Sequence, residues 1–139
     1  MAQGFKYVYN DYGKDPTRIT EFLMKNNEAG VAGEAVKLVS GRWTKASGTD
    51  AIGGFLTSNV TAGTDKACEV ILAREGDWYD AAYSGTAAAG FKEGIDVVAI
   101  AADGLSADAA TVTGGAISVL SINTEKKTAR VKVKNRQFS

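Results

Sequence analysis

The sequence contains no histidine, one cysteine and one proline among its 139 residues. Histidine is the commonest general base and the commonest metal ligand, so its absence removes the usual basis for acid–base catalysis and for metal binding. The single cysteine, Cys68, cannot form a disulfide within the chain, and its place in an alternating apolar run favours a buried thiol. We therefore expect no catalytic residue, no metal site and no cofactor, and we do not expect an enzyme.

The chain also lacks net charge and long apolar runs. Its 16 basic residues balance 16 acidic residues, so the whole molecule has no evident attraction to nucleic acid or to an anionic membrane. No run approaches the ~18 apolar residues that a membrane-spanning helix needs. The N-terminal stretch lacks the apolar core of a signal peptide. Neither nucleic acid nor a membrane is an expected partner.

Glycine, in contrast, is abundant, with 16 residues or about 12% of the chain. Apolar residues alternate with polar ones in several short runs, and this period of two is typical of strands. Six to eight such runs at fairly regular spacing predict a mainly β fold, a small barrel-like or sandwich-like single domain of short strands. The clearest runs are residues 36–39, 51–56, 68–73, 95–101, 116–122 and 128–134.

Residues 1–30 differ from the β-rich remainder, residues 31–139. Four aromatic residues, Phe5, Tyr7, Tyr9 and Tyr12, stand in an otherwise polar segment. If residues 5–9 are extended, Phe5, Tyr7 and Tyr9 lie on one side. This segment is either a first strand packed on its own core or an N-terminal arm that docks on another chain by strand addition.

A short helix is expected at about residues 16–24. Asp15 followed by Pro16 resembles a helix N-cap with proline at the first helical position. Ile19, Phe22 and Leu23 would then form one apolar stripe.

The middle of the chain carries the remaining large rings. Trp43, Trp78, Tyr79 and Tyr83 are either core residues or part of a subunit or capsid interface. Asp77 and Asp80 form the one carboxylate pair that could perform acid–base chemistry, although a turn with solvated acids explains them more simply. The glycine pair at 53–54, inside a strand, indicates a bulge or a close backbone approach.

The C-terminal run is basic. Arg130, Lys132, Lys134 and Arg136 lie in or just after an alternating segment, and residues 125–139 carry six basic residues and one acidic residue, a net charge of 6 − 1 = +5. Three interpretations remain open: an edge strand that lysines protect from aggregation, an electrostatic contact with an acidic partner or second copy, and contact with nucleic acid.

The order of features in residues 35–83 resembles tailed-phage capsid decoration (cement) proteins of the lambda head-decoration type. The shared progression is AVKL, then RWTKASGTDAIGGFL, a polar loop, and CEVILAREGDWYDAAY. The later stretch GIDVVAIAADGL followed by AISVLSI is similar to the broader cement family. The N-terminal segment and the basic C-terminal run depart from the lambda-type pattern.

The resemblance implies a structural virion protein that binds the outer surface of an expanded phage capsid and stabilises the shell. Its partners would be the major capsid protein and further copies of itself, typically in a homotrimer. By position in the chain, Phe5, Tyr7, Tyr9 and Tyr12 would supply the capsid contact.

An alternative is a carbohydrate-binding or adhesin-like β-domain of a virion or cell surface. In that case Trp43, Trp78 and Tyr79 would form a sugar platform, which requires exposed and coplanar rings.

Overall fold

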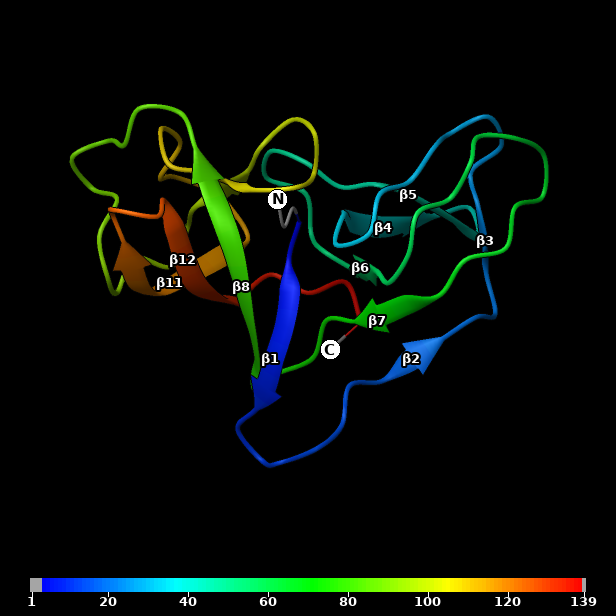
Figure 1. Cartoon of the computed structure of the whole chain (residues 1–139), viewed down its shortest axis with the longest axis horizontal. Coiled ribbons are helices and arrows are strands. Elements are labelled where there is room, and N and C mark those ends of the chain that lie inside the picture. Colours follow the sequence, from blue (N-terminus) through cyan, green and yellow to red (C-terminus); the bar gives the residue numbers. More distant parts are fainter. Residues whose placement is uncertain (1–3, 139) are drawn as a thin grey trace.

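The computed structural model describes residues 4–138, and every regular element in that part of the chain is a strand. Strands and isolated β-bridges together account for 41% of the described residues, which confirms the mainly β class. They form two sheets of six strands each that lie side by side (Figure 1).

The first sheet is curled and centred on the long strand β8. Strand β12 pairs with one side of β8, and β1 and β10 pair with successive parts of its other side. The sheet contains β1 (Lys6–Asn10), β8 (Asp77–Ser84), β9 (Ala99–Ile100), β10 (Ala107–Asp108), β11 (Ile117–Asn123) and β12 (Thr128–Val133).

The second sheet is built around the hairpin of β4 and β5. Its turn, Ser40 and Gly41, has φ angles of 51° and 77°, as the two central residues of a tight hairpin require. The sheet order is β2 (Arg18–Ile19), β7 (Val70–Leu72), β6 (Gly54–Leu56), β4 (Ala35–Val39), β5 (Arg42–Lys45) and β3 (Leu23–Met24).

The prediction of a short helix at residues 16–24 is wrong. The segment is extended instead and supplies β2 and β3 to the second sheet. Its backbone is held by pairing with neighbouring segments: the amide of Leu72 donates to Thr17, and the amide of Met24 donates to Lys66. Local helical preference is weak beside such tertiary pairing.

Two hydrophobic clusters stabilise the domain. The larger one lies between the sheets and takes Phe55 and Ala35 from the second sheet and Tyr79 and Val131 from the first. The smaller one covers the opposite face of the second sheet and contains Trp43. The second sheet is therefore buried on both faces, which explains why neighbouring residues of β4 both lie inside.

Residues 4–30 are integrated into both sheets. Strand β1 pairs with β8, and the Phe5 ring is buried in the inter-sheet core, 4.9 Å from the ring of Phe55. In this structure the segment expected as a possible arm is therefore a first strand of the domain. Residues 1–3 of that proposed arm lie outside the described residues.

A bulge in β1 overturns the expected arrangement of its rings. The register with β8 shifts between Tyr7 and Tyr9, so the strict alternation of side chains is broken there. Tyr7 turns inward against Tyr79, whereas Tyr9 turns outward onto Trp78. The three rings at positions 5, 7 and 9 therefore do not share one side.

The C-terminal segment crosses from β12 to the second sheet (Figure 1). The side-chain amide of Gln137 accepts from the backbone N–H of Leu38 at 2.8 Å and donates to its carbonyl at 2.7 Å. Gln137 thus bonds Leu38 as a neighbouring strand would. The Phe138 ring packs edge-on against Trp43, with 6.3 Å between ring centroids.

We expect Gly54→Ala to destabilise the domain by about 3 kcal/mol, because overpacking at a backbone contact cannot relax easily. A Cβ at Gly54 would lie 2.4 Å from the carbonyl oxygen of Ile71. Gly63→Ala is the control, since its new methyl meets only the flexible, exposed side chain of Lys66. Urea denaturation measures both. Equal stability of the two variants would contradict the close approach.

Candidate binding surface

Aromatic and charged side chains gather on the outward face of the first sheet. In the registers of the sheet, Tyr9 of β1 and Lys132 of β12 lie on either side of Trp78 of β8. The Tyr9 and Trp78 rings stack at 5.1 Å with 16° between their planes, and the Lys132 ammonium lies 4.9 Å from the centroid of the Trp78 ring. Since β1 and β12 flank β8 on opposite sides, the indole is held from both sides.

Asp11 ties this row together. Its carboxylate accepts a hydrogen bond from the Trp78 indole N–H and an ion-paired bond from Lys132 at 2.6 Å. The hydrogen bond from Lys132 and, to a smaller extent, the one from Trp78 lower the pKa of the Asp11 carboxyl. The carboxylate therefore stays ionised, and it fixes Lys132 over the ring by charge attraction as well as by the cation–π contact.

A second pair lies one step further along the same face. Arg130 donates to both carboxylate oxygens of Asp80, at 2.8 and 3.0 Å, in a bidentate pair between directly opposed residues. The bonds to Asp80 raise the pKa of Arg130. A shallow hollow of about 390 Å³ adjoins the pair and is lined by Asp80, Ser121, Ile122, Asn123, Thr128, Ala129 and Arg130.

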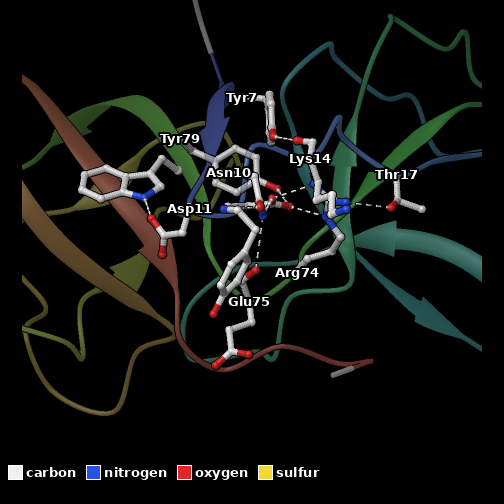
Figure 2. Close-up of polar contacts among 11 residues, drawn as sticks. Tyr7, Asn10, Asp11, Lys14, Thr17, Arg74, Glu75 and Tyr79 are labelled. Atoms are coloured by element: carbon white, nitrogen blue, oxygen red, sulfur yellow. Dashed lines mark hydrogen bonds and ion pairs between the residues drawn. The ribbon is translucent and has the colours of Figure 1, made fainter.

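Behind this face, a buried polar network fixes β1 against β8 (Figure 2). Asp77 is 1% exposed and accepts two bonds from Arg74, at 3.0 and 2.8 Å. Asn10 donates to the same carboxylate at 2.8 Å, and the Tyr79 hydroxyl donates at 3.4 Å. The buried Asp77 carboxylate therefore accepts hydrogen bonds from three different side chains, which compensate for the loss of water around its charge.

The same network positions the loop that carries Tyr12. Arg74 also donates to the Thr17 hydroxyl at 3.1 Å, and the Tyr7 hydroxyl donates to the Lys14 carbonyl at 2.9 Å (Figure 2). The amide oxygen of Asn10 accepts from the backbone N–H of Tyr12 at 2.8 Å. With its backbone held in this way, the Tyr12 side chain is 70% exposed, and its ring lies close to Gly76 in the turn before β8.

The remaining predicted rings do not contribute to this surface. Phe5, Trp43 and Tyr79 are buried, and burial raises the pKa of the Tyr79 hydroxyl. Tyr83 is half-buried, with its ring 4.8 Å from that of Phe91. Trp43 and Tyr79 even belong to different clusters, so the sugar platform of Trp43, Trp78 and Tyr79 is wrong.

The basic C-terminal run is not an edge strand, and that interpretation is wrong. Strand β12 lies between β11 and β8. Its outward charges have intramolecular acidic partners: Arg130 has Asp80, Lys132 has Asp11, and Lys134, just past the strand, has Asp96. Arg136 lies beyond the strand and donates to the Val133 carbonyl at 2.7 Å.

The acidic partners of the basic residues on this surface were the part that the sequence did not predict. Asp11 and Asp96 stand in loops far from β12 in the chain, and no local pattern links them to lysines of that strand. Asp80 carried a signal, because alternation along 77–84 places it on the face of Trp78. The same alternation separates Asp80 from Asp77, which lies buried on the opposite face of β8, so the two carboxylates do not form a catalytic pair.

Within residues 4–138, no group of three or more acidic or cysteine side chains is arranged to hold a metal ion. The same residues contain no helix long and apolar enough to cross a membrane. Comparison of the chain with protein-family models, with curated proteins and with solved structures gave no match.

We expect Asp77→Asn to lower the free energy of unfolding by about 3 kcal/mol, since it leaves Arg74 without its charge partner in a mostly buried site. Asp65→Asn is a matched control, because Asp65 also pairs with an arginine, Arg42, but its side chain is 60% exposed. That change should cost less than about 1 kcal/mol. Guanidinium denaturation of both variants tests the difference, and equal losses would refute the structural role of the Asp77 network.

Proposed function

We propose that this protein is a capsid decoration protein, which binds the outside of an expanded phage shell and stabilises it. The observation that carries the proposal is the outward face of the first sheet, where the stacked rings of Tyr9 and Trp78 are framed by ion pairs and the exposed Tyr12 follows in the next loop. The resemblance of residues 35–83 to cement proteins supplies the kind of partner. The major capsid protein would be bound at the outer surface of the virion.

The physical properties of the surface suit a structural interface. Aromatic residues and arginine are the side chains that dominate the energy of protein interfaces. Here Trp78 is held by Tyr9 and Lys132, and Arg130 is held by Asp80, before any partner arrives. Because the side chains are already ordered, binding would cost less conformational entropy than binding through a flexible arm.

Self-association would add to this effect. A homotrimer presents three copies of the same surface, so the second and third contacts form at high effective concentration. Each copy can then bind weakly while the assembly holds several shell subunits together. The homotrimer is part of the proposal.

The ion pairs of the surface indicate how much electrostatic attraction would contribute to docking. Since Asp11, Asp80 and Asp96 pair with Lys132, Arg130 and Lys134 within the same chain, these three basic side chains leave little net charge for long-range attraction. Apolar contact would therefore supply most of the binding energy.

Carbohydrate binding remains a second candidate, with a different site from the one expected from the sequence. The polar hollow beside Arg130 offers hydroxyl and amide groups from Ser121, Asn123 and Thr128. Against it, a sugar ring packs on an open aromatic face, and both sides of the Trp78 indole are already in contact with Tyr9 and Lys132.

We expect the double variant Tyr9→Ala, Tyr12→Ala to bind expanded, empty shells of the phage that encodes the protein at least ~10-fold more weakly than wild type, since such anchors contribute about 1–2 kcal/mol each. Phe138→Ala is the control, an aromatic residue 49% exposed at the rim of the second sheet. Co-sedimentation at several salt concentrations measures affinity and stoichiometry.

Saturable binding to expanded but not to immature shells, lost in the double variant and kept in the control, is the expected result. Binding that the control loses and the double variant keeps would move the interface to the second sheet. No binding of the wild type to either shell would refute the proposed function, and a glycan screen would then test the hollow beside Arg130.

A further inference from the structure

The side chain of Glu34 is a buried carboxyl with an incomplete set of partners. Glu34 directly precedes β4 and is 2% exposed. One carboxyl oxygen accepts from the backbone N–H of Val31 at 3.3 Å, and the other, Oε2, has no hydrogen-bond partner among the described residues. A buried ionised carboxylate with an oxygen unpaired in this way is strongly unfavourable.

The charged groups around Glu34 do not resolve this problem. Lys45 of β5 lowers the pKa of the carboxyl, whereas Glu28, earlier in the same loop, and Asp103, in the turn between β9 and β10, raise it. Burial is the largest influence, and it raises the pKa of Glu34 to about 7. The Glu28 carboxylate is itself occupied, because it accepts from the backbone N–H of Lys45 at 2.8 Å.

Glu34 lies where three segments of the chain meet. Its own carbonyl accepts from Leu56 at 3.0 Å, and the next amide, that of Ala35, donates to Gly104 in the turn between β9 and β10 at 2.9 Å. The preceding residue, Gly33, accepts from the amide of Phe5 at 2.8 Å. The loop that carries Glu34 therefore holds the N-terminal end of β1 and joins it to both sheets.

This junction is tight on one side and open on the other. A Cβ at Gly4 would lie 2.6 Å from the backbone of Gly33, and a Cβ at Gly104 would lie 3.1 Å from the Glu34 side chain. Gly4, Ala32 and Gly33 also line a hollow of about 480 Å³ between β1 and the second sheet. On that side, Ala32 and Gly33 of the loop at 31–34 border open space.

We propose that Glu34 is a proton-operated latch: its protonated carboxyl keeps the loop at 31–34 closed on the N-terminal end of β1, and its ionisation releases that end. The released state lets the carboxylate reach water or Lys45. The latch belongs to the isolated chain and does not rest on the proposed function.

The sign follows from linkage. The pKa of Glu34 is raised in the closed state, so the closed state binds the proton more tightly than the released state does. The closed junction is therefore fully stabilised below the ordinary glutamate pKa and loses stability as the pH rises towards the raised value of about 7. Above it, the released population stays at its higher level.

Backbone amide hydrogen exchange of the full chain at pH 6 and pH 8, corrected for the intrinsic pH dependence of exchange, tests the latch. For a pKa moving between about 7 and its ordinary value of 4.5, opening should increase about 10-fold between these two pH values. We expect that loss of protection at the amides of Phe5, Gly33 and Ala35. The amide of Val131, in the middle of the first sheet, should show no such change.

In Glu34→Gln, which cannot ionise, the 10-fold change should disappear, while Glu125→Gln, at an exposed turn, should behave as wild type. An equal pH response in wild type and Glu34→Gln would overturn the proposal. So would unchanged protection of Phe5 and Gly33 in the wild type between pH 6 and pH 8, a result that requires no variant to fold.

Discussion

The ion pair between Arg74 and Asp77 is the contact on which the arrangement of this domain depends. Arg74 lies two residues after the end of β7 in the second sheet, and Asp77 begins β8 in the first, so the pair spans the connection from one sheet to the other. Asn10 and Thr17, which bond the same two residues, come from either side of the loop after β1. One buried carboxylate thereby fixes the position of the first strand, the loop after it and the connection between the sheets.

The charged side chains on the surface of the first sheet pair with one another. They order that surface rather than attract a charged partner. The chain carries a basic C-terminal run, yet acids from three separate parts of the sequence pair with Arg130, Lys132 and Lys134 on the surface of the first sheet. Such pairs contribute little stability individually where they are exposed. Their effect is to hold the aromatic and guanidinium groups of the surface in one geometry, which favours a defined structural contact over general attraction to anions.

The sequence predicted the fold class and most strands because alternation directly reflects burial on one face. It failed where long-range pairing decided the outcome. Residues 16–24 have a plausible helical stripe, but hydrogen bonds to Leu72 and Lys66 hold them extended. Residues 95–101 read as one buried strand, yet only Ala99–Ile100 pairs as a strand. Conversely, β8 spans Asp77–Ser84, which is not among the clearest alternating runs of the sequence.

The candidate surface was predictable only in its components. The sequence indicates Tyr9 and Tyr12 as part of an N-terminal arm. It indicates Trp78 and Lys132 separately, as part of an interface. A single bulge in β1 reverses the side on which Tyr9 lies and so brings the two groups together. Bulges leave little trace in a pattern of alternating residues, and the acidic partner Asp11 comes from a loop. The juxtaposition therefore requires the three-dimensional structure.

The bonding of Gln137 to Leu38 has a consequence for how the chain reaches this state. The rim of the second sheet is completed by residues near the far end of the sequence, and β1 waits for β8, with Asn10 and Asp77 separated by 67 positions. Contacts between residues so far apart in the sequence form late, because the entropy cost of closing a long loop comes before the contacts contribute any stability. A growing chain would leave β1 without its partner until residues 77–84 have been made, and Leu38 of β4 without Gln137 until the last residues have been made. The apolar strands are then most vulnerable to association with other chains before residues 134–138 have been made.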